Sequence, residues 1–189
     1  MQTELKQIQR EVGITTVFVT HDQEEALTLC DRMAIFNRGQ VVQIGPPNQV
    51  YERPTTVFAA QFLGAANFFT GCPSGQRNGL GRVMLDGGGE IFTEDPLPEA
   101  GTPANLIVRP EKLTISARAE YADVGTSTMN ELVGRLDTIS YLGSSIVYTV
   151  SASPGQITVF QQNREAVSLT PGKTVFLRWL PRHSVLVRG

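Results

Sequence analysis

One histidine stands where a phosphate-binding side chain could act. His21 follows the apolar run of residues 14–20, ITTVFVT, and precedes residues 23–29, QEEALTL. The run predicts a strand buried on both faces, as in parallel sheets, and the second segment predicts a helix that Asp22 caps. Ligands of open α/β sheets bind at the edge where strands pass into helices. An imidazole there can donate a hydrogen bond to a phosphate oxygen, or it can simply satisfy the helix terminus.

The residues around His21 resemble a known family. VFVTHDQEEAL, followed by CDRMAIFNRGQVVQIGPPNQVYERPTTVFAAQFLG, is similar to the end of the nucleotide-binding domain of ABC transporter ATPases. The similarity is to the bacterial importer type that includes the maltose, sulfate, polyamine and ferric-iron ATPases, and it runs from about Glu4 to Phe69. In that family the histidine of THDQ is the switch histidine. The resemblance therefore implies that His21 is catalytic and cofactor-binding in the intact ATPase, where it senses the γ-phosphate of ATP.

Three sequence motifs that ATP hydrolysis needs are absent from the sequence. It contains no G-x-x-x-x-G-K-[ST] run to cradle phosphates, no LSGGQ signature and no acidic magnesium-binding strand. We therefore expect the chain to be the C-terminal part of a longer ATPase subunit. ATP and Mg²⁺ are expected as cofactors of the full-length parent. For this chain alone we expect no cofactor, no metal ligands and no ATP hydrolysis.

The overall composition argues against several classes of protein. The 16 basic and 18 acidic residues give a net charge of −2, which argues against a nucleic-acid partner. Cys30 and Cys72 have no metal-ligand spacing and predict two reduced thiols. No apolar stretch approaches the ~20 residues that span a bilayer. With the family resemblance, this implies a cytoplasmic protein held peripherally at the inner face of the membrane by a partner.

Residues 1–64 are expected to form an α/β remnant of a P-loop ATPase domain. The patterns predict helices at residues 4–12, 23–29, 49–52 and 57–63, and strands at 14–20, 32–36 and 40–44. The first strand would lack its central parallel neighbours. Because exposed apolar edges invite pairing with another chain, we expect this chain to dimerise or exchange elements.

Residues 65–189 are expected to form an all-β, OB-like barrel. Ten short strand candidates, separated by Gly- and Pro-rich turns, favour a sandwich or barrel. The segment IVRPEKL, residues 107–113, resembles the family's RPE segment, so the resemblance implies its regulatory TOBE domain. We find no internal repeat. We expect Tyr148, Phe160 and Phe176 in the core, and Arg38, Arg109 and His183 at the surface.

The family resemblance implies the C-terminal part of the ATP-hydrolysing subunit of a bacterial ABC importer. The implied partners are a second copy of the subunit, inner-membrane permease subunits and, indirectly, a periplasmic solute-binding protein. A polyamine or ferric iron is favoured as the solute, with sulfate, phosphonate or sugar as alternatives. The alternative function, of a different class, is a stand-alone OB-like module that binds a small anion or a protein partner.

Overall fold

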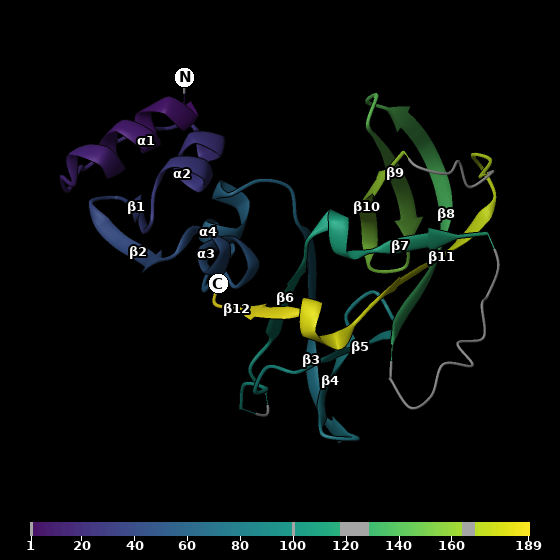
Figure 1. The fold of residues 1–189 in the computed structure, drawn as a ribbon. Coiled ribbons are helices and arrows are strands. Elements are labelled where there is room, and N and C mark those ends of the chain that lie inside the picture. Colours follow the sequence, from purple (N-terminus) through teal and green to yellow (C-terminus); the bar gives the residue numbers. More distant parts are fainter. Residues whose placement is uncertain (1, 100, 118–128, 164–168) are drawn as a thin grey trace. The chain divides into compact units, whose positions relative to one another are not determined.

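The computed structural model describes residues 2–99, 101–117, 129–163 and 169–189 (Figure 1). The chain divides into two compact units, one formed by residues 1–64 and the other by residues 65–188. Each unit is described by itself below.

The first unit consists of four short helices and one hairpin. The helices are α1 (Gln2–Val12), α2 (Gln23–Leu29), α3 (Pro47–Glu52) and α4 (Val57–Phe62), and the antiparallel hairpin joins β1 (Met33–Asn37) to β2 (Gln40–Gly45). The predicted cap of α2 is confirmed, because the side chain of Asp22 accepts a hydrogen bond from the Glu25 amide. In α4 the side chain of Thr56 likewise accepts one from the Ala59 amide.

The buried core of the first unit is small. It consists of Met33, Ile35, Val50, Ala59 and Leu63, with a few partly buried side chains packed against it. The hairpin contributes only one of its faces to this core. Its other face is apolar and exposed, and it carries the side chains of Ala34, Phe36, Val41 and Ile44.

The predicted strand at residues 14–20 does not form. These residues have no regular secondary structure, and the side chains of Val17 and Val19 are 88% and 91% exposed. A strand needs a neighbour for its backbone groups, and the described residues supply none here. All strand pairings in the described part are antiparallel, so the parallel sheet of a P-loop domain is not seen.

The described residues of the second unit form two five-stranded antiparallel sheets. One has the order β12-β6-β3-β4-β5 and the other β10-β9-β8-β11-β7. The strands agree closely with those predicted: β3 (Asn67–Arg77), β4 (Leu80–Leu85), β5 (Glu90–Thr93), β6 (Ala104–Val108), β7 (Thr114–Ser116), β8 (Asn130–Tyr141), β9 (Ser145–Ala152), β10 (Gly155–Gln162), β11 (Thr174–Trp179) and β12 (Val185–Val187).

The second unit is an internal duplication, and the expectation of no repeat is wrong. The strands β3 to β7 correspond in order to β8 to β12, and β12 of the first sheet corresponds to β7 of the second. With these correspondences the two sheets have the same strand order, read from opposite ends. Each half ends in a short 3-10 helix, η1 (Pro110–Lys112) or η2 (Pro181–His183), followed by its last strand. That last strand pairs in the sheet of the other half: β7 lies beside β11, and β12 lies beside β6. The two halves therefore exchange their final strands.

The duplication leaves few traces in the sequence. Both β3 and β8 begin with the pattern N-x-x-x-G, which is Asn67 to Gly71 in one half and Asn130 to Gly134 in the other. Both glycines are required by close backbone contacts. A Cβ on Gly71 would collide with the carbonyl of Met84, and one on Gly134 would lie 2.8 Å from the carbonyl oxygen of Ser151.

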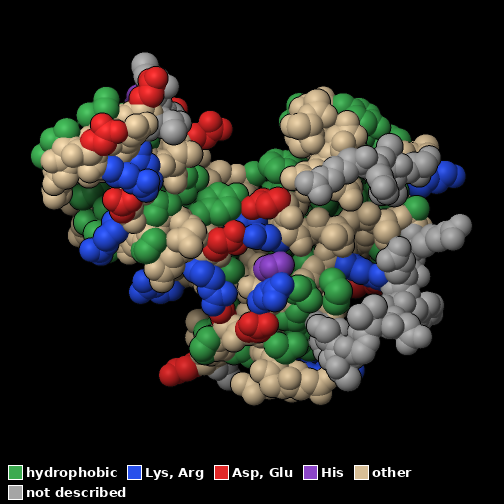
Figure 2. Space-filling view, in the orientation of Figure 1, with side chains coloured by type: hydrophobic (Ala, Val, Ile, Leu, Met, Phe, Trp, Pro, Cys, Tyr) green, Lys and Arg blue, Asp and Glu red, His purple; other side chains and the backbone are tan. Residues whose placement is uncertain are grey.

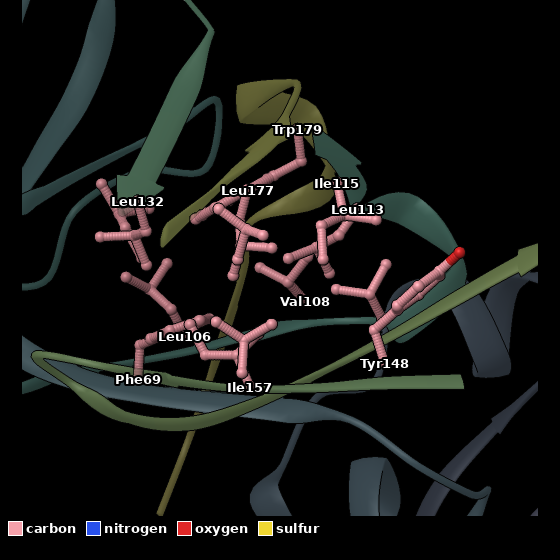
Figure 3. Packing of buried hydrophobic residues seen from close by; sticks show 14 of the residues in the cluster. Phe69, Leu106, Val108, Leu113, Ile115, Leu132, Tyr148, Ile157, Leu177 and Trp179 are labelled. Atoms are coloured by element: carbon pink, nitrogen blue, oxygen red, sulfur yellow. The ribbon is translucent and has the colours of Figure 1, made fainter. Parts of the chain in front are cut away.

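The two halves share one hydrophobic core (Figure 3). Phe69 of the first sheet stacks on Trp179 of the second, with ring centroids 6.0 Å apart. Tyr148 is buried in this core, as predicted. Phe160 is not, because its side chain lies on the outer face of β10 and is 37% exposed. Phe176 is half-buried.

Candidate functional site

His21 lies on an ordered turn that leads into α2. The hydroxyl of Thr20 donates a hydrogen bond to the Glu25 carboxylate over 2.8 Å and accepts one from the Asp22 amide over 2.9 Å. Asp22 in turn accepts from the Glu25 amide over 3.1 Å. Three hydrogen bonds therefore hold the residues on both sides of His21. This ordering comes from local sequence, because Thr, Asp and Glu are the residue types that close helix N-termini.

The side chain of His21 is exposed. The carboxylates of Asp22 and Glu25 are both engaged by the turn, so this arrangement leaves the imidazole to meet a ligand from outside. Chemically, such a side chain can donate a hydrogen bond to an anionic oxygen. Among the described residues, no group of three His, Cys, Asp or Glu side chains could hold a metal ion.

Arg109 is not the surface cation that the sequence predicts. Arg109 is only 2% exposed, and its Nη1 donates a hydrogen bond to the carbonyl oxygen of Ala65 over 3.0 Å. Arg109 lies between β6 and η1, within the IVRPEKL segment. The signal that could have revealed this was the segment itself, since a cation between a buried strand and a proline turn has little access to water.

Arg38 and His183, the other two residues predicted at the surface, differ in exposure. Arg38 is exposed, as predicted, in the turn of the β1–β2 hairpin. His183 is partly buried in η2, and the Nε of Arg182 lies 3.4 Å from its Nε2. Arg38 belongs to the hairpin of the first unit, and His183 belongs to the second unit.

A buried polar network in the second unit was missed by sequence reasoning. The Oγ of Ser184 accepts hydrogen bonds from Asn130 Nδ2 over 3.0 Å and from Trp179 Nε1 over 2.8 Å. Its carbonyl accepts from the hydroxyl of Thr93 over 2.6 Å. All four residues are almost fully buried. The network is internally satisfied, so it stabilises the junction of the two sheets and offers no binding site.

Comparison with protein families identifies part of the second unit. Residues 106–187 match the TOBE domain family. The fold of part of the chain is also similar to a solved structure, that of a cytoplasmic molybdate-binding protein with molybdate bound. That match has a TM-score of 0.56 and 19% sequence identity, and it covers 64% of this chain and 94% of the other. At that identity the likeness establishes an OB-like fold and nothing about ligands.

Several curated proteins match along the chain. The spermidine/putrescine import ATP-binding protein of Thermobifida fusca is 40% identical over 192 residues, which cover all of this chain and 49% of the relative. The same protein of Rubrobacter xylanophilus is 38% identical, again over all of this chain and 49% of the relative. A protein of the same name from Pseudomonas aeruginosa is 39% identical, over 94% of this chain and 46% of the relative.

These matches cover only part of each relative. The chain spans about half the length of these curated relatives. Among the described residues, no helix is both long and apolar enough to cross a membrane. Over about half of their length, the chain is similar to these import ATP-binding proteins, and residues 106–187 within it match the TOBE domain.

Proposed function

We propose that this chain is the C-terminal part of the ATP-hydrolysing subunit of a bacterial ABC importer for polyamines. Residues 1–64 are the end of the nucleotide-binding domain, and residues 65–189 are the regulatory domain. The observation that carries the proposal is the match along the whole chain to spermidine/putrescine import ATP-binding proteins. The names of these relatives favour a polyamine over ferric iron, sulfate, phosphonate or sugar.

His21 is the residue that we assign to the chemistry. In the complete subunit its imidazole hydrogen-bonds the γ-phosphate of ATP and helps to hold the attacking water. Two features of this chain support the assignment: the side chain is exposed, and the turn that carries it is held by Thr20, Asp22 and Glu25. Phosphoryl transfer depends mostly on positioning and charge stabilisation, which a preorganised donor supplies.

The surface of the first unit supports its assignment as part of a larger domain. Val17 and Val19 are almost fully exposed, and so is much of the outer face of the β1–β2 hairpin, including Phe36 at 63%. Figure 2 shows hydrophobic side chains at the surface of this unit. Exposed apolar surface on this scale marks an interface. We propose that the remaining half of the subunit buries this surface, with the P-loop and the parallel strands that would lie beside residues 14–20.

The partners and cofactors follow from this role. Two subunits bind two ATP molecules with Mg²⁺, contact the inner-membrane permease subunits from the cytoplasmic side, and serve a periplasmic solute-binding protein indirectly. Nucleic acid is not among the proposed partners. The net charge of −2 lacks the basic excess that nucleic-acid binding needs.

The proposal can be tested with a chimeric subunit. In the chimera, this chain replaces the half of the Thermobifida fusca relative that it matches, and the other half of the relative is kept. Mg-ATP hydrolysis is then measured with and without His21→Ala. The chimera is expected to hydrolyse ATP. The His21→Ala version is expected to lose at least about 100-fold in kcat, the scale of removing one donor to a transition state. His183→Ala is the matched control and should leave the rate unchanged.

Two results would contradict the proposal. A folded chimera that hydrolyses no ATP would show that residues 1–64 do not complete the nucleotide-binding domain. An unchanged rate after His21→Ala would remove the assigned role of the histidine. The solute is tested separately, by uptake of labelled spermidine in cells whose own ATP-binding subunit is replaced by the chimera.

A further inference from the structure

The side chains of Thr20 and Glu25 meet across the position of His21. The hydroxyl of Thr20 donates to Oε2 of Glu25 over 2.8 Å, and the same oxygen of Thr20 accepts from the Asp22 amide over 2.9 Å. Thr20 and Glu25 are both half-buried, whereas the intervening His21 is exposed. One hydroxyl group therefore ties the backbone on both sides of the histidine to α2.

This arrangement differs from the usual start of a helix. There, the carboxylate of the third helical residue bonds the amide of the N-cap residue directly. Glu25 is the third residue of α2 and Asp22 is its N-cap, but the carboxylate of Glu25 bonds Thr20 instead. The oxygen of Thr20 then accepts from the Asp22 amide. A direct bond would hold nothing before Asp22, so the longer route through Thr20 is what includes His21.

This network limits where the imidazole of His21 can go. The direction in which a side chain leaves the backbone depends on the backbone angles of its residue. Once the residues on either side of His21 are held, the imidazole keeps only the rotations about its two side-chain bonds. A hydrogen-bond donor that is placed before the reaction begins costs no reorganisation in the transition state. Thr20 and Glu25 therefore supply position, and neither needs to contact a ligand.

We propose that Glu25, acting through the hydroxyl of Thr20, is a positioning residue for His21. This inference rests on the proposed function, because the ligand of His21 is there the γ-phosphate of ATP. It adds a chemical requirement at two positions. Residue 20 has to donate and accept at one atom, as a hydroxyl does, and residue 25 has to accept. Asp22 has another role, because its side chain accepts from the Glu25 amide and so caps α2.

The first test measures Mg-ATP hydrolysis by the chimeric subunit described above. Thr20→Val removes the hydroxyl at nearly constant shape, and Glu25→Ala removes the acceptor. Each is expected to lower kcat about tenfold and to leave KM for ATP unchanged, because a small misplacement of a reacting group slows the chemical step. Thr20→Ser and Glu25→Gln keep a hydroxyl and an acceptor oxygen, and should retain most of the rate.

A double-mutant cycle separates positioning from a general effect on the fold. In the His21→Ala chimera, Thr20→Val should lower the rate no further, because no imidazole is left to position. With His21 present, Thr20→Val combined with Glu25→Ala should cost no more than either change alone, since both break the same path. Glu24→Ala is the matched control, because it removes another carboxylate from the first turn of α2 and should leave kcat unchanged.

The second test uses this chain without ATP. Amide hydrogen exchange, followed by NMR, reports on the hydrogen bond of the Asp22 amide to Thr20. Thr20→Val removes that bond and should speed exchange of the Asp22 amide about tenfold. Glu25→Ala should speed it as well, because the hydroxyl of Thr20 is then no longer held. The amides of β9, in the other unit, are the internal reference and should not change.

The outcomes distinguish this inference from the proposed function. If the chimera loses its rate with His21→Ala but not with Thr20→Val or Glu25→Ala, the proposed function stands and the positioning role is overturned. An equal loss from Thr20→Val with and without His21 would overturn it as well. An inactive chimera would contradict the proposed function, and exchange then decides alone: an Asp22 amide that Thr20→Val does not affect would show that Thr20 does not hold the turn.

Discussion

Asn67 and Asn130 make the same pair of hydrogen bonds in the two halves of the second unit. Asn67 accepts from the amide of Thr158 and donates to its carbonyl, each over 2.8 Å. Asn130 accepts from the amide of Phe92 over 2.7 Å and donates to its carbonyl over 2.9 Å. The side chain of Asn67 thus bonds the backbone of β10, and that of Asn130 bonds the backbone of β5, as a neighbouring strand would. Because β10 and β5 are the edge strands of the two sheets, these bonds block further pairing there.

The asparagines should differ in their effect on stability. Asn130→Ala leaves the Phe92 backbone and the Ser184 hydroxyl buried with lost partners, and should lower the free energy of unfolding by roughly 2–4 kcal/mol. Asn67→Ala should cost less, because Thr158 is only half-buried. Urea unfolding followed by Trp179 fluorescence measures both values. Thr138→Ala, at an exposed position on β8, is the control, and a cost for Asn130→Ala no larger than this would refute the edge-pairing argument.

The extended segment at residues 14–20 should drive self-association of the isolated chain. Val17 and Val19 expose nearly their whole side chains, and the backbone around them is not paired in a sheet. We expect dimers or larger species in sedimentation velocity at micromolar concentrations, and a shift to monomer for Val17→Lys with Val19→Lys, because charge blocks edge pairing. Thr15→Lys with Thr16→Lys adds the same charge without removing an apolar side chain. Unchanged association of the valine double variant would place the contact elsewhere.

The two cysteines should differ in reactivity. Burial is the main cause that raises the pKa of the Cys30 thiol, and its Sγ donates a hydrogen bond to the carbonyl of Ala26 over 2.8 Å. Cys72 is exposed. Because the thiolate is the nucleophile, a raised pKa lowers the reactive fraction near neutral pH, and this deficit shrinks as the pH rises through the pKa of Cys30. Iodoacetamide near pH 8 should therefore alkylate Cys72 first. The reverse order, in a folded protein, would contradict the burial of Cys30.

Local features of the fold could be predicted from the sequence. Helix caps such as Asp22 and Thr56 depend on residues three positions apart, and the alternation of β9 or β10 depends on neighbours within one strand. The strands of the second unit therefore agree with the predicted ones within a few residues. The exposed Phe160 is an exception, because alternation alone does not say which face of an edge strand is covered.

Features that depend on distant partners could not be predicted. Residues 14–20 have the composition of a buried strand, but a strand forms only beside another, and the described residues provide none. Arg109 is buried and donates a hydrogen bond to Ala65, which is far away in sequence. The duplication stayed hidden because few residues are identical in the two halves, among them the asparagine and glycine of N-x-x-x-G and the proline that opens each 3-10 helix. The role of His21 stays a prediction for the same reason, since its ligand is not part of the chain.

The exchange of final strands has a consequence for synthesis on the ribosome. The sheet that holds β3, β4, β5 and β6 receives its fifth strand, β12, from the very last part of the second half. At ~5–20 residues per second, translation leaves that sheet without its outer strand for several seconds after β6 has been made. The edge of β6 is open to other nascent chains during this interval. The second unit is therefore exposed to misassembly from the synthesis of β6 until that of β12.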